Sequence, residues 1–312
     1  MLRVSPLSVG ADLARGLFGE VTVIGTSATL TLGGSFRHTA RELGLTWMAG
    51  SPFGVAAPAP RDDAAVDEVL SSESDQPPPR WSYLDVGSPF DYARQGQLYV
   101  ARDLPDPGKQ SAAWQSAVDA LCAQLVEAAG GRTLALFSST AAAARAAAAV
   151  REATDLPVLL QGEDSAGALA HRFASDARTC LFGTRSFWQG IDVVGSACQL
   201  VILDRIPFPH IDDPLMKARL AAAGDHGFMD VTLPPAAVLL AQGAGRLIRS
   251  TTDRGVVVVL DPRLATARYG EVLLRTLPGF YRAGSLDAVL TSLKAIDASA
   301  DEVRPVGPRR AS

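Results

Sequence analysis

Six short runs of apolar residues recur along the chain, and each is apolar throughout instead of alternating with polar positions. They occupy residues 21–25, 133–137, 156–160, 179–182, 199–203 and 256–260. Unbroken apolar runs of this length are typical of strands that are buried on both faces of a parallel sheet. The pattern therefore predicts an α/β domain built on a mainly parallel sheet.

Stretches of helical character lie between these runs. One of them, AAWQSAVDALCAQLVEAAGG, ends in two glycines, which are frequent at helix ends. Another, STAAAARAAAAVREA, begins with Ser139 and Thr140, whose side chains can cap a helix. SAGALAHRFA and PPAAVLLAQGAGRLIRS continue the alternation. This order of elements is that of repeated strand–helix units.

The apolar run at residues 21–25 lacks an evident neighbour, because only about twenty residues precede it and none of them reads as a second strand. A lone apolar strand exposes unpaired backbone groups and is prone to aggregation. This run is therefore expected either to join the main sheet or to belong to a domain that this chain does not contain.

The amino-acid composition excludes few classes of protein. The chain has 312 residues, of which 47% are hydrophobic and 20% charged, as in ordinary globular domains. A net charge of −4 gives no support for nucleic-acid binding from overall electrostatics, although a local basic groove would not show in that sum. No stretch reaches the length of a membrane span and the N-terminus does not read as a signal peptide, so we expect a cytoplasmic protein without a membrane partner.

The three cysteines, Cys122, Cys180 and Cys198, are far apart in apolar surroundings. Neither a metal-binding pair nor a disulfide framework is indicated by this spacing. Free cysteine usually behaves as a small apolar residue, so buried thiols are expected at all three positions.

The segment QGAGRLIRSTTDRGVVVVLDPR, residues 242–263, carries the first candidate chemistry. Spacings of three and four place Gln242, Arg246 and Arg249 on one stripe of a helix. Two planar guanidinium groups beside a glutamine suit a polyanion such as a triphosphate. A solvated helix with surface arginines fits the same pattern equally well.

Three further segments place hydroxyl groups directly after apolar runs. FGTRSFWQGIDVVG carries Thr184, Ser186 and Asp192 where open α/β sheets bind ligands, at the carboxyl end of a strand. FSSTAAAAR puts Ser139 and Thr140 at a helix N-terminus, where backbone N–H groups attract phosphate. GTSATL ends the first apolar run. A loop with a capping aspartate, a helix cap and a strand-to-loop turn are the plain structural alternatives.

Two nucleotide-binding patterns are absent from the sequence. No GxxxxGK[ST] phosphate loop occurs, and no Asp-Glu pair ends an apolar strand in the manner of a Mg²⁺ site. Whatever Arg246 and Arg249 reach, the chain is not expected to hold a nucleotide by itself.

Taken in order, these segments resemble the C-terminal half of the DinG-like and XPD-like superfamily 2 DNA helicases. The resemblance rests on VIGTSATLTLGGSFRHTARELGL, LDVGSPFDYARQGQLYVARDLPDP, TLALFSST, FGTRSFWQGIDVVG, LDRIPFPHIDDP and QGAGRLIRSTTDRGVVVVLDPR, of which QGAGRLIRS and SFWQGIDV are the most specific. It implies a RecA-like parallel sheet flanked by helices, which is the second motor domain of such a helicase.

The same resemblance implies how the chain is divided. Residues 1–30 would be a remnant of the first motor domain, and residues 31–110 a connecting segment with a mobile insertion rich in proline, serine and acidic residues. The RecA-like domain would cover residues 111–285, and residues 286–312 would form a polar tail.

Individual residues receive roles from the resemblance alone. Arg246 and Arg249 match the arginines that reach the γ-phosphate of an ATP held mainly by another domain. The residues that match ATP-binding positions are Gln242, Gly245, Gly190 and Asp192. Those that match contacts to single-stranded DNA are Ser139, Thr140, Thr184, Ser186 and Phe187. Those that match the motif coupling nucleotide state to DNA grip are Thr26, Ser27 and Ala28. Family members often carry Glu where this chain has Gln189.

ATP with Mg²⁺ and single-stranded DNA are the ligands that the resemblance implies. The family's N-terminal half supplies the phosphate loop, the Mg²⁺-binding acids and, in many members, an iron–sulfur cluster on four cysteines. No segment of this chain matches that half, so neither metal nor cluster ligands are assigned here. The leading prediction is the C-terminal motor domain of an ATP-dependent DNA helicase that needs a separate N-terminal half for turnover. The alternative is an inactive truncated or split-gene module that binds single-stranded DNA or docks on a partner domain.

Overall fold

A seven-stranded sheet in the spatial order β5-β6-β4-β7-β8-β3-β9 is the centre of the larger of two units into which the chain divides. All neighbouring strands pair in parallel. The strands are β3 (Gly96–Val100), β4 (Thr133–Leu136), β5 (Val158–Leu160), β6 (Cys180–Gly183), β7 (Leu200–Leu203), β8 (Gly255–Val259) and β9 (Tyr281–Arg282). We call this part, residues 89–207 with 239–312, the sheet unit, and residues 1–88 with 208–238 the N-terminal unit. The computed structural model describes residues 4–45, 50–52, 80–109, 112–176, 178–184, 198–210 and 212–301.

Five of the six predicted strands are confirmed, as β4 to β8. The sequence analysis did not identify β3, which pairs with β8 from Gly96–Gly255 to Val100–Val259 and so lies inside the sheet. The parallel sheet flanked by helices confirms the predicted α/β, RecA-like fold class.

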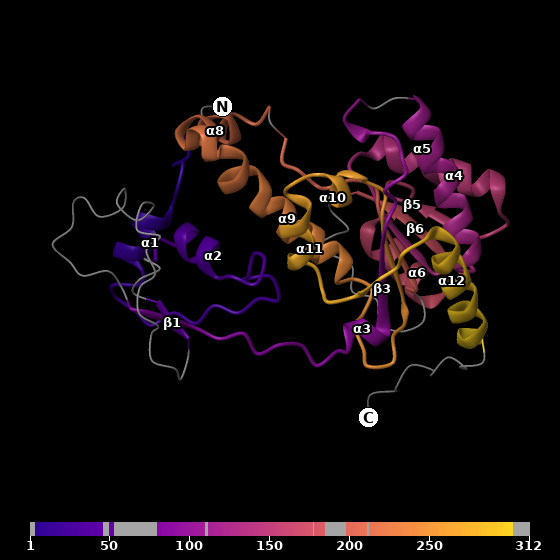
Figure 1. Cartoon of the computed structure of the whole chain (residues 1–312), viewed down its shortest axis with the longest axis horizontal. Coiled ribbons are helices and arrows are strands. Elements are labelled where there is room, and N and C mark those ends of the chain that lie inside the picture. The colour runs from indigo at the N-terminus through magenta and orange to yellow at the C-terminus, as the bar shows by residue number, and fades with distance from the viewer. Residues whose placement is uncertain are drawn as a thin grey trace. The chain divides into compact units, whose positions relative to one another are not determined.

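One face of the sheet is covered by α4 (Ala112–Ala128), α5 (Thr140–Ala153) and α12 (Leu286–Asp301), which lie beside the strands in Figure 1. Their apolar side chains form a single cluster with alternate strand residues such as Ala135 and Ile202. The intervening residues, such as Leu134 and Val201, point to the other face and are also buried. Burial on both faces explains why these strands are apolar throughout.

The remaining helices of the sheet unit are short. They are α3 (Tyr92–Gln95), α6 (Ala166–Ser175), α10 (Arg263–Thr266) and α11 (Gly270–Thr276), together with the last half of α9 (Leu233–Ala244). Within the described part of the chain, no helix is both long enough and apolar enough to cross a membrane.

Local signals in the sequence explain where two helices begin and end. The Ser139 hydroxyl accepts a hydrogen bond from the Ala142 amide and so caps α5, as predicted. After α4 the chain turns at Gly130 and Gly131, whose φ angles of +60° and +93° favour glycine. Cys122, Cys180 and Cys198 are free, buried thiols, which confirms the prediction for them.

The N-terminal unit is held by a few polar contacts among short elements. These elements are α1 (Gly10–Gly16), α2 (Arg37–Glu42), β1 (Gly50–Pro52), β2 (Trp81–Tyr83) and α8 (Pro214–Ala223). Arg41 on α2 forms an ion pair with Asp230 at 3.0 Å, and Arg219 on α8 donates to the Leu7 carbonyl at 2.7 Å. Both contacts join the start of the chain to residues more than a hundred positions later.

The strand predicted at residues 21–25 is wrong. The segment has no strand pairing, and Val21, Val23 and Ile24 are 53%, 46% and 87% exposed. Apolar composition alone predicted a buried strand, but no described element of the N-terminal unit covers these side chains.

Two of the predicted domain limits differ from the structure. β3 lies within the predicted connecting segment, yet it belongs to the main sheet. α12 lies within the predicted polar tail, yet its Val289 and Leu293 are buried in the main cluster. The apolar stripe of α12 is what makes it part of the sheet unit.

Candidate functional site

Polar side chains gather at the edge of the sheet where parallel strands end. Thr184 follows β6, Ser138 follows β4, Asp204 follows β7 and Asp261 comes two residues after β8. Because these four strands are neighbours, the polar residues lie along one continuous edge. The carboxyl edge is where open α/β sheets bind ligands.

Ser139 and Thr140 stand at the same edge, at the N-terminus of α5, and both are exposed. The Ser139 hydroxyl is engaged in the cap, and its O–H can still donate outward because a hydroxyl both donates and accepts. The first turn of α5 has no acidic residue. A helix N-terminus without acids presents a favourable field to a phosphate.

Thr184 is fixed by a residue that the sequence analysis did not identify. Its amide and its hydroxyl donate to the same oxygen, Oε1 of Gln161, at 2.6 and 2.9 Å. Gln161 directly follows β5, and its backbone amide donates to the Phe182 carbonyl. Two neighbouring strand ends are thereby tied together, which holds the half-buried Thr184 directly after β6.

Asp204 and Asp261 are the most deeply buried acidic residues of this edge. The Ser138 hydroxyl donates to Oδ2 of Asp204 at 2.7 Å, while Oδ1 of Asp204 has no hydrogen-bond partner among the described residues. Burial raises the pKa of Asp204 to about 6, and hydrogen bonds from Ser138 together with the Arg205 charge offset part of that rise. The neighbouring Arg205 guanidinium lies over the Trp114 ring at 4.1 Å.

The Asp261 carboxylate is fully used in hydrogen bonds within the chain. Its Oδ2 accepts from the Ile206 amide at 3.0 Å and from Arg263 at 2.7 Å, and its Oδ1 accepts from Arg263 Nε at 2.9 Å. This bidentate pair is fully buried on the Asp261 side. Both oxygens are therefore occupied.

No magnesium site is apparent in the described part of the chain. There, no group of three or more His, Cys, Asp or Glu side chains could hold a metal ion. Both oxygens of Asp261 already accept hydrogen bonds from Arg263 and the Ile206 amide, so they are not available to a metal ion. The described residues do not fit a Mg²⁺ site, so no ligand role is assigned to them.

The predicted arginines lie near the opposite edge of the sheet, in the loop between α9 and β8. The prediction that Gln242, Arg246 and Arg249 share one helical stripe is wrong, because α9 ends at Ala244. The backbone amide of Arg246 donates to the Gly243 carbonyl in a tight turn instead of continuing the helix. The next two residues, Leu247 and Ile248, are both buried, so this part of the loop packs into the core.

We call residues 245–254 the arginine loop. Two of its three arginines, Arg246 and Arg249, are half-buried, whereas Arg254 is exposed. Upstream on α9, the side-chain Oε1 of Gln242 is buried and has no hydrogen-bond partner among the described residues. Most buried polar atoms in native proteins have a hydrogen-bond partner, so this oxygen can still accept a hydrogen bond.

Two buried polar residues hold the arginine loop. Asp253 Oδ2 accepts from the Arg249 and Ser250 amides at 2.7 and 2.8 Å, and its Oδ1 accepts from the Ser250 hydroxyl at 2.6 Å. Gln95, just before β3, donates from Nε2 to the carbonyls of Ser250 and Asp253 at 2.8 and 3.1 Å. The sequence analysis identified neither residue as part of the site.

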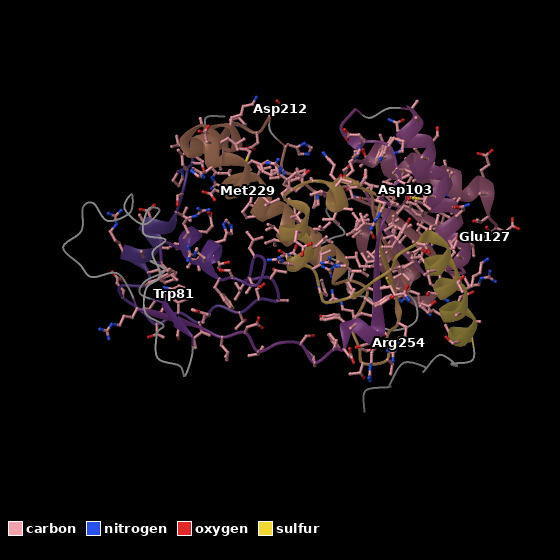
Figure 2. The ribbon with its side chains drawn as sticks, in the orientation of Figure 1. Trp81, Asp103, Glu127, Asp212, Met229 and Arg254 are labelled. Atoms are coloured by element: carbon pink, nitrogen blue, oxygen red, sulfur yellow. The ribbon has the colours of Figure 1, made fainter. Side chains whose placement is uncertain are left out.

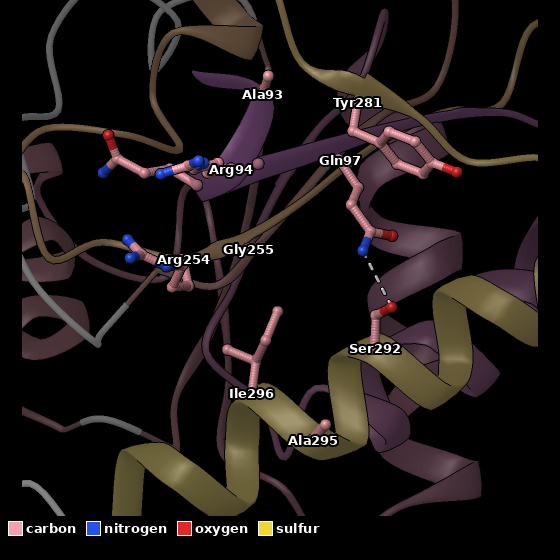
Figure 3. A pocket seen from close by; sticks show the side chains of 11 residues that line it. Ala93, Arg94, Gln97, Arg254, Gly255, Tyr281, Ser292, Ala295 and Ile296 are labelled. Carbon is pink, nitrogen blue, oxygen red and sulfur yellow. Dashed lines mark hydrogen bonds between the residues drawn. The ribbon is translucent and has the colours of Figure 1, made fainter. Parts of the chain in front are cut away.

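Beside this loop, at the amino ends of β3 and β8, lies a cavity of about 290 Å³ (Figure 3). Arg94 and Arg254 stand on one side of it, and Gln97 donates to the Ser292 hydroxyl of α12 on the other. Arg254, also labelled in Figure 2, donates to the Asp253 carbonyl at 2.8 Å. The cavity therefore shares Gln95 and Arg254 with the support of the arginine loop.

The predicted site residues thus do not form one cluster. Ser139, Thr140 and Thr184 lie at the carboxyl edge of the sheet, whereas Gln242, Gly245, Arg246 and Arg249 lie on α9 and in the loop that leads to the amino end of β8. Thr26, Ser27 and Ala28 are exposed residues of the N-terminal unit. Ser186, Phe187, Gly190 and Asp192 fall outside the described residues.

Comparison with known proteins places this geometry in context. The family model described as "Helicase C-terminal domain" matches residues 122–280. An "ATP-dependent helicase DinG" of Mycobacterium tuberculosis (strain ATCC 25618 / H37Rv) is 48% identical over 299 residues, which are 95% of this chain and 40% of that protein. An "ATP-dependent DNA helicase YoaA" of Escherichia coli (strain K12) is 38% identical over 282 residues, 89% of this chain and 39% of that protein. The chain therefore spans about two fifths of the length of these relatives.

Two further similarities were found. A "3'-5' exonuclease DinG" of Bacillus subtilis (strain 168) is 30% identical over 285 residues, 88% of this chain and 27% of that protein. A solved structure titled "XPD_APO" has a TM-score of 0.48 and 21% identity, over 61% of this chain and 40% of that one.

Proposed function

Because the chain belongs to the helicase C-terminal domain family, in the DinG-like and XPD-like group of superfamily 2, we propose that it is the second motor domain of an ATP-dependent DNA helicase. In this proposal ATP is held mainly by another domain, and Arg246 and Arg249 reach its γ-phosphate. Such arginines stabilise the charge of the transferring phosphoryl group and are worth about 10³- to 10⁵-fold in rate.

The observation that carries the proposal is the construction of the arginine loop. Arg246 and Arg249 are half-buried in a loop whose backbone is tied down at Ser250 and Asp253, which favours a fixed guanidinium over a solvated one. The unpartnered Gln242 oxygen lies upstream on α9. Gly190 and Asp192 are added to the ATP-binding set from the resemblance alone.

The carboxyl edge of the sheet would contact single-stranded DNA. Ser139 and Thr140 at the N-terminus of α5, with Thr184 held by Gln161, offer hydroxyl and amide groups to backbone phosphates. Ser186 and Phe187 join this set from the resemblance. Binding of this kind is independent of sequence and weakens as salt rises.

The start of the chain would complete a neighbouring motor domain. The exposure of Val21, Val23 and Ile24 supports this assignment, because apolar side chains in series are normally covered. Thr26, Ser27 and Ala28 follow directly and would couple nucleotide state to DNA grip. The neighbouring domain would also supply the Mg²⁺ ligands.

The test combines this chain with a domain that carries the phosphate loop and measures DNA-stimulated ATP hydrolysis. Arg246→Ala and Arg249→Ala are expected to lower kcat by about 10³-fold or more while single-stranded DNA affinity stays within about twofold. Arg275→Ala is the matched control, because Arg275 is an exposed arginine of α11 whose partner is Glu271. Full turnover by Arg246→Ala would contradict the proposal, and DNA binding without any turnover in the parent assembly would favour the inactive module.

A further inference from the structure

Gln95 connects two segments of the sheet unit, the α3 turn and the arginine loop, with a single side chain. Its Oε1 accepts from the Asp91 amide at 2.9 Å, and its Nε2 donates to the carbonyls of Ser250 and Asp253. The residue is only 5% exposed. Both hydrogens of the amide nitrogen are used, so this buried group is fully satisfied at its donor end.

The orientation of the Gln95 amide is fixed by its partners. Exchanging its oxygen and nitrogen would set an acceptor against the carbonyl oxygens of Ser250 and Asp253 and a donor against the Asp91 N–H. Each of the three contacts would then be repulsive or unmade. The position therefore requires an amide at this length, and a carboxylate of the same shape cannot replace it.

Asp253 extends the same support to Arg249. Gln95 holds the Asp253 carbonyl, while the Asp253 carboxylate holds the Arg249 and Ser250 amides. Asp253 is 6% exposed, so these bonds are largely protected from water. The chain from Gln95 through Asp253 to the Arg249 backbone contains only direct hydrogen bonds of 3.1 Å or less.

This support matters because individual side-chain contacts, and not regular secondary structure, hold the loop. α9 stops at Ala244 and β8 starts at Gly255, and the ten residues between them have no regular secondary structure. A misplacement of about 1 Å in a catalytic group can cost on the order of 10²-fold in rate. Asp253 holds the Arg249 backbone from within the loop, and Gln95 links Asp253 to the start of β3.

We infer that Gln95 is a positioning residue for the arginine loop, setting the backbone from which Arg249 reaches the nucleotide. The inference rests on the proposed function, since it assigns Gln95 an effect on ATP turnover through Arg249. Gln95 itself touches neither ATP nor DNA in this assignment. It acts before the chemical step, by keeping the loop in one conformation.

The experiment uses the same assembly of this chain with a phosphate-loop domain. Gln95→Glu keeps the shape and the Asp91 contact but sets a carboxylate against two carbonyls, and Gln95→Met removes the hydrogen bonds without adding charge. Both variants are expected to lower kcat by about 10- to 100-fold, with KM for ATP and affinity for single-stranded DNA changed less than about threefold. Gln97→Glu is the matched control, because Gln97 lines the same cavity but bonds Ser292 (Figure 3).

A double-mutant cycle separates positioning from a general loss of structure. The double variant Gln95→Met/Arg249→Lys should have a kcat only slightly lower than that of Arg249→Lys alone. Once the Arg249 guanidinium is lost, positioning of its backbone by Gln95 no longer affects the rate. Additive losses, or a kcat of Gln95→Met equal to that of the parent, would overturn the inference. If Arg246→Ala also retains turnover, the proposed function fails as well; if Arg246→Ala is inactive and Gln95→Met is normal, only this inference fails.

Discussion

The Ser138 hydroxyl donates to the Asp204 carboxylate across 2.7 Å, between the carboxyl ends of the neighbouring strands β4 and β7. This bond joins the turn that begins α5 to a buried acid whose second oxygen has no partner among the described residues. A carboxyl group in that position is poorly solvated, and its protonation state affects the stability of the fold.

Asp204 should make the protein less stable as the pH rises through its titration range. Burial raises its pKa from 3.8 to about 6, so the folded chain holds the proton more tightly than the unfolded chain. The free energy of unfolding should therefore fall between about pH 4 and pH 6 and level off above, by roughly 2–4 kcal/mol at about 1.4 kcal/mol per pKa unit.

The variant Asp204→Asn isolates this effect. Asparagine keeps an oxygen that can accept from Ser138 but does not titrate. In urea unfolding at a series of pH values, the stability of the variant relative to wild type should increase between pH 4 and pH 7. The exposed Asp103 (Figure 2), changed to Asn, is the control for loss of a charge. Parallel pH profiles of Asp204→Asn and wild type would contradict the raised pKa.

Ser139 is expected to have two separable roles, helix cap and phosphate contact. Ser139→Ala removes the bond to the Ala142 amide and should cost about 1 kcal/mol of stability. Ser139→Asp restores a capping acceptor but adds a negative charge where a DNA phosphate would lie. Under the proposed function, both variants weaken binding of single-stranded DNA, and only Ser139→Ala lowers the unfolding midpoint.

Fluorescence anisotropy with a labelled single strand, recorded at several salt concentrations, measures the affinities. The difference between Ser139→Asp and wild type should shrink as salt rises, because the added repulsion is screened. Equal affinity of Ser139→Asp and wild type at low salt would remove Ser139 from the DNA-contacting set.

Asp253 should contribute strongly to stability as well as to the arginine loop. Asp253→Ala leaves the Arg249 and Ser250 amides and the Ser250 hydroxyl without their acceptor. Each buried donor left unsatisfied costs about 1–3 kcal/mol, so a total loss of at least about 2 kcal/mol is expected. Asp253→Asn keeps one acceptor oxygen and should lose less. We expect the urea midpoint to be highest for wild type, lower for Asp253→Asn and lowest for Asp253→Ala. An Asp253→Ala midpoint equal to that of wild type would contradict this role of Asp253.

Much of the sheet could be predicted because the local sequence of most strands identifies them. β4 to β8 are apolar throughout, as burial on both faces requires, and β4 and β5 are each followed by a helix with a serine cap. β3 escaped notice because GQLYV contains Gln97, whose side chain is satisfied by Ser292 on α12. A partner 195 residues away cannot be read from local pattern.

The candidate site was predictable only in part, for the same reason. The hydroxyl groups after β4 and β6 follow from strand endings, and the arginines from their motif. α9 ends at Ala244, before Arg246, although the spacing of Gln242, Arg246 and Arg249 fits a continuing helix. Gln95 and Asp253 meet across 158 positions of sequence, so their network is visible only in the folded chain.

Gly131 should be the least replaceable glycine of the turn between α4 and β4. Its φ of +93° is a conformation that side chains rarely adopt, and an added Cβ would collide with the backbone carbonyl of Arg178. Neither the backbone of Arg178 nor that of the turn can yield easily, because the turn feeds directly into β4 in the middle of the sheet. Gly131→Ala is expected to cost at least about 2 kcal/mol in urea unfolding. Gly167→Ala is the matched control: Gly167 lies in α6 with open space around its Cβ position, so the same change there should stabilise the protein by roughly 0.5–1 kcal/mol. A Gly131→Ala variant as stable as wild type would mean that the turn can relax away from Arg178.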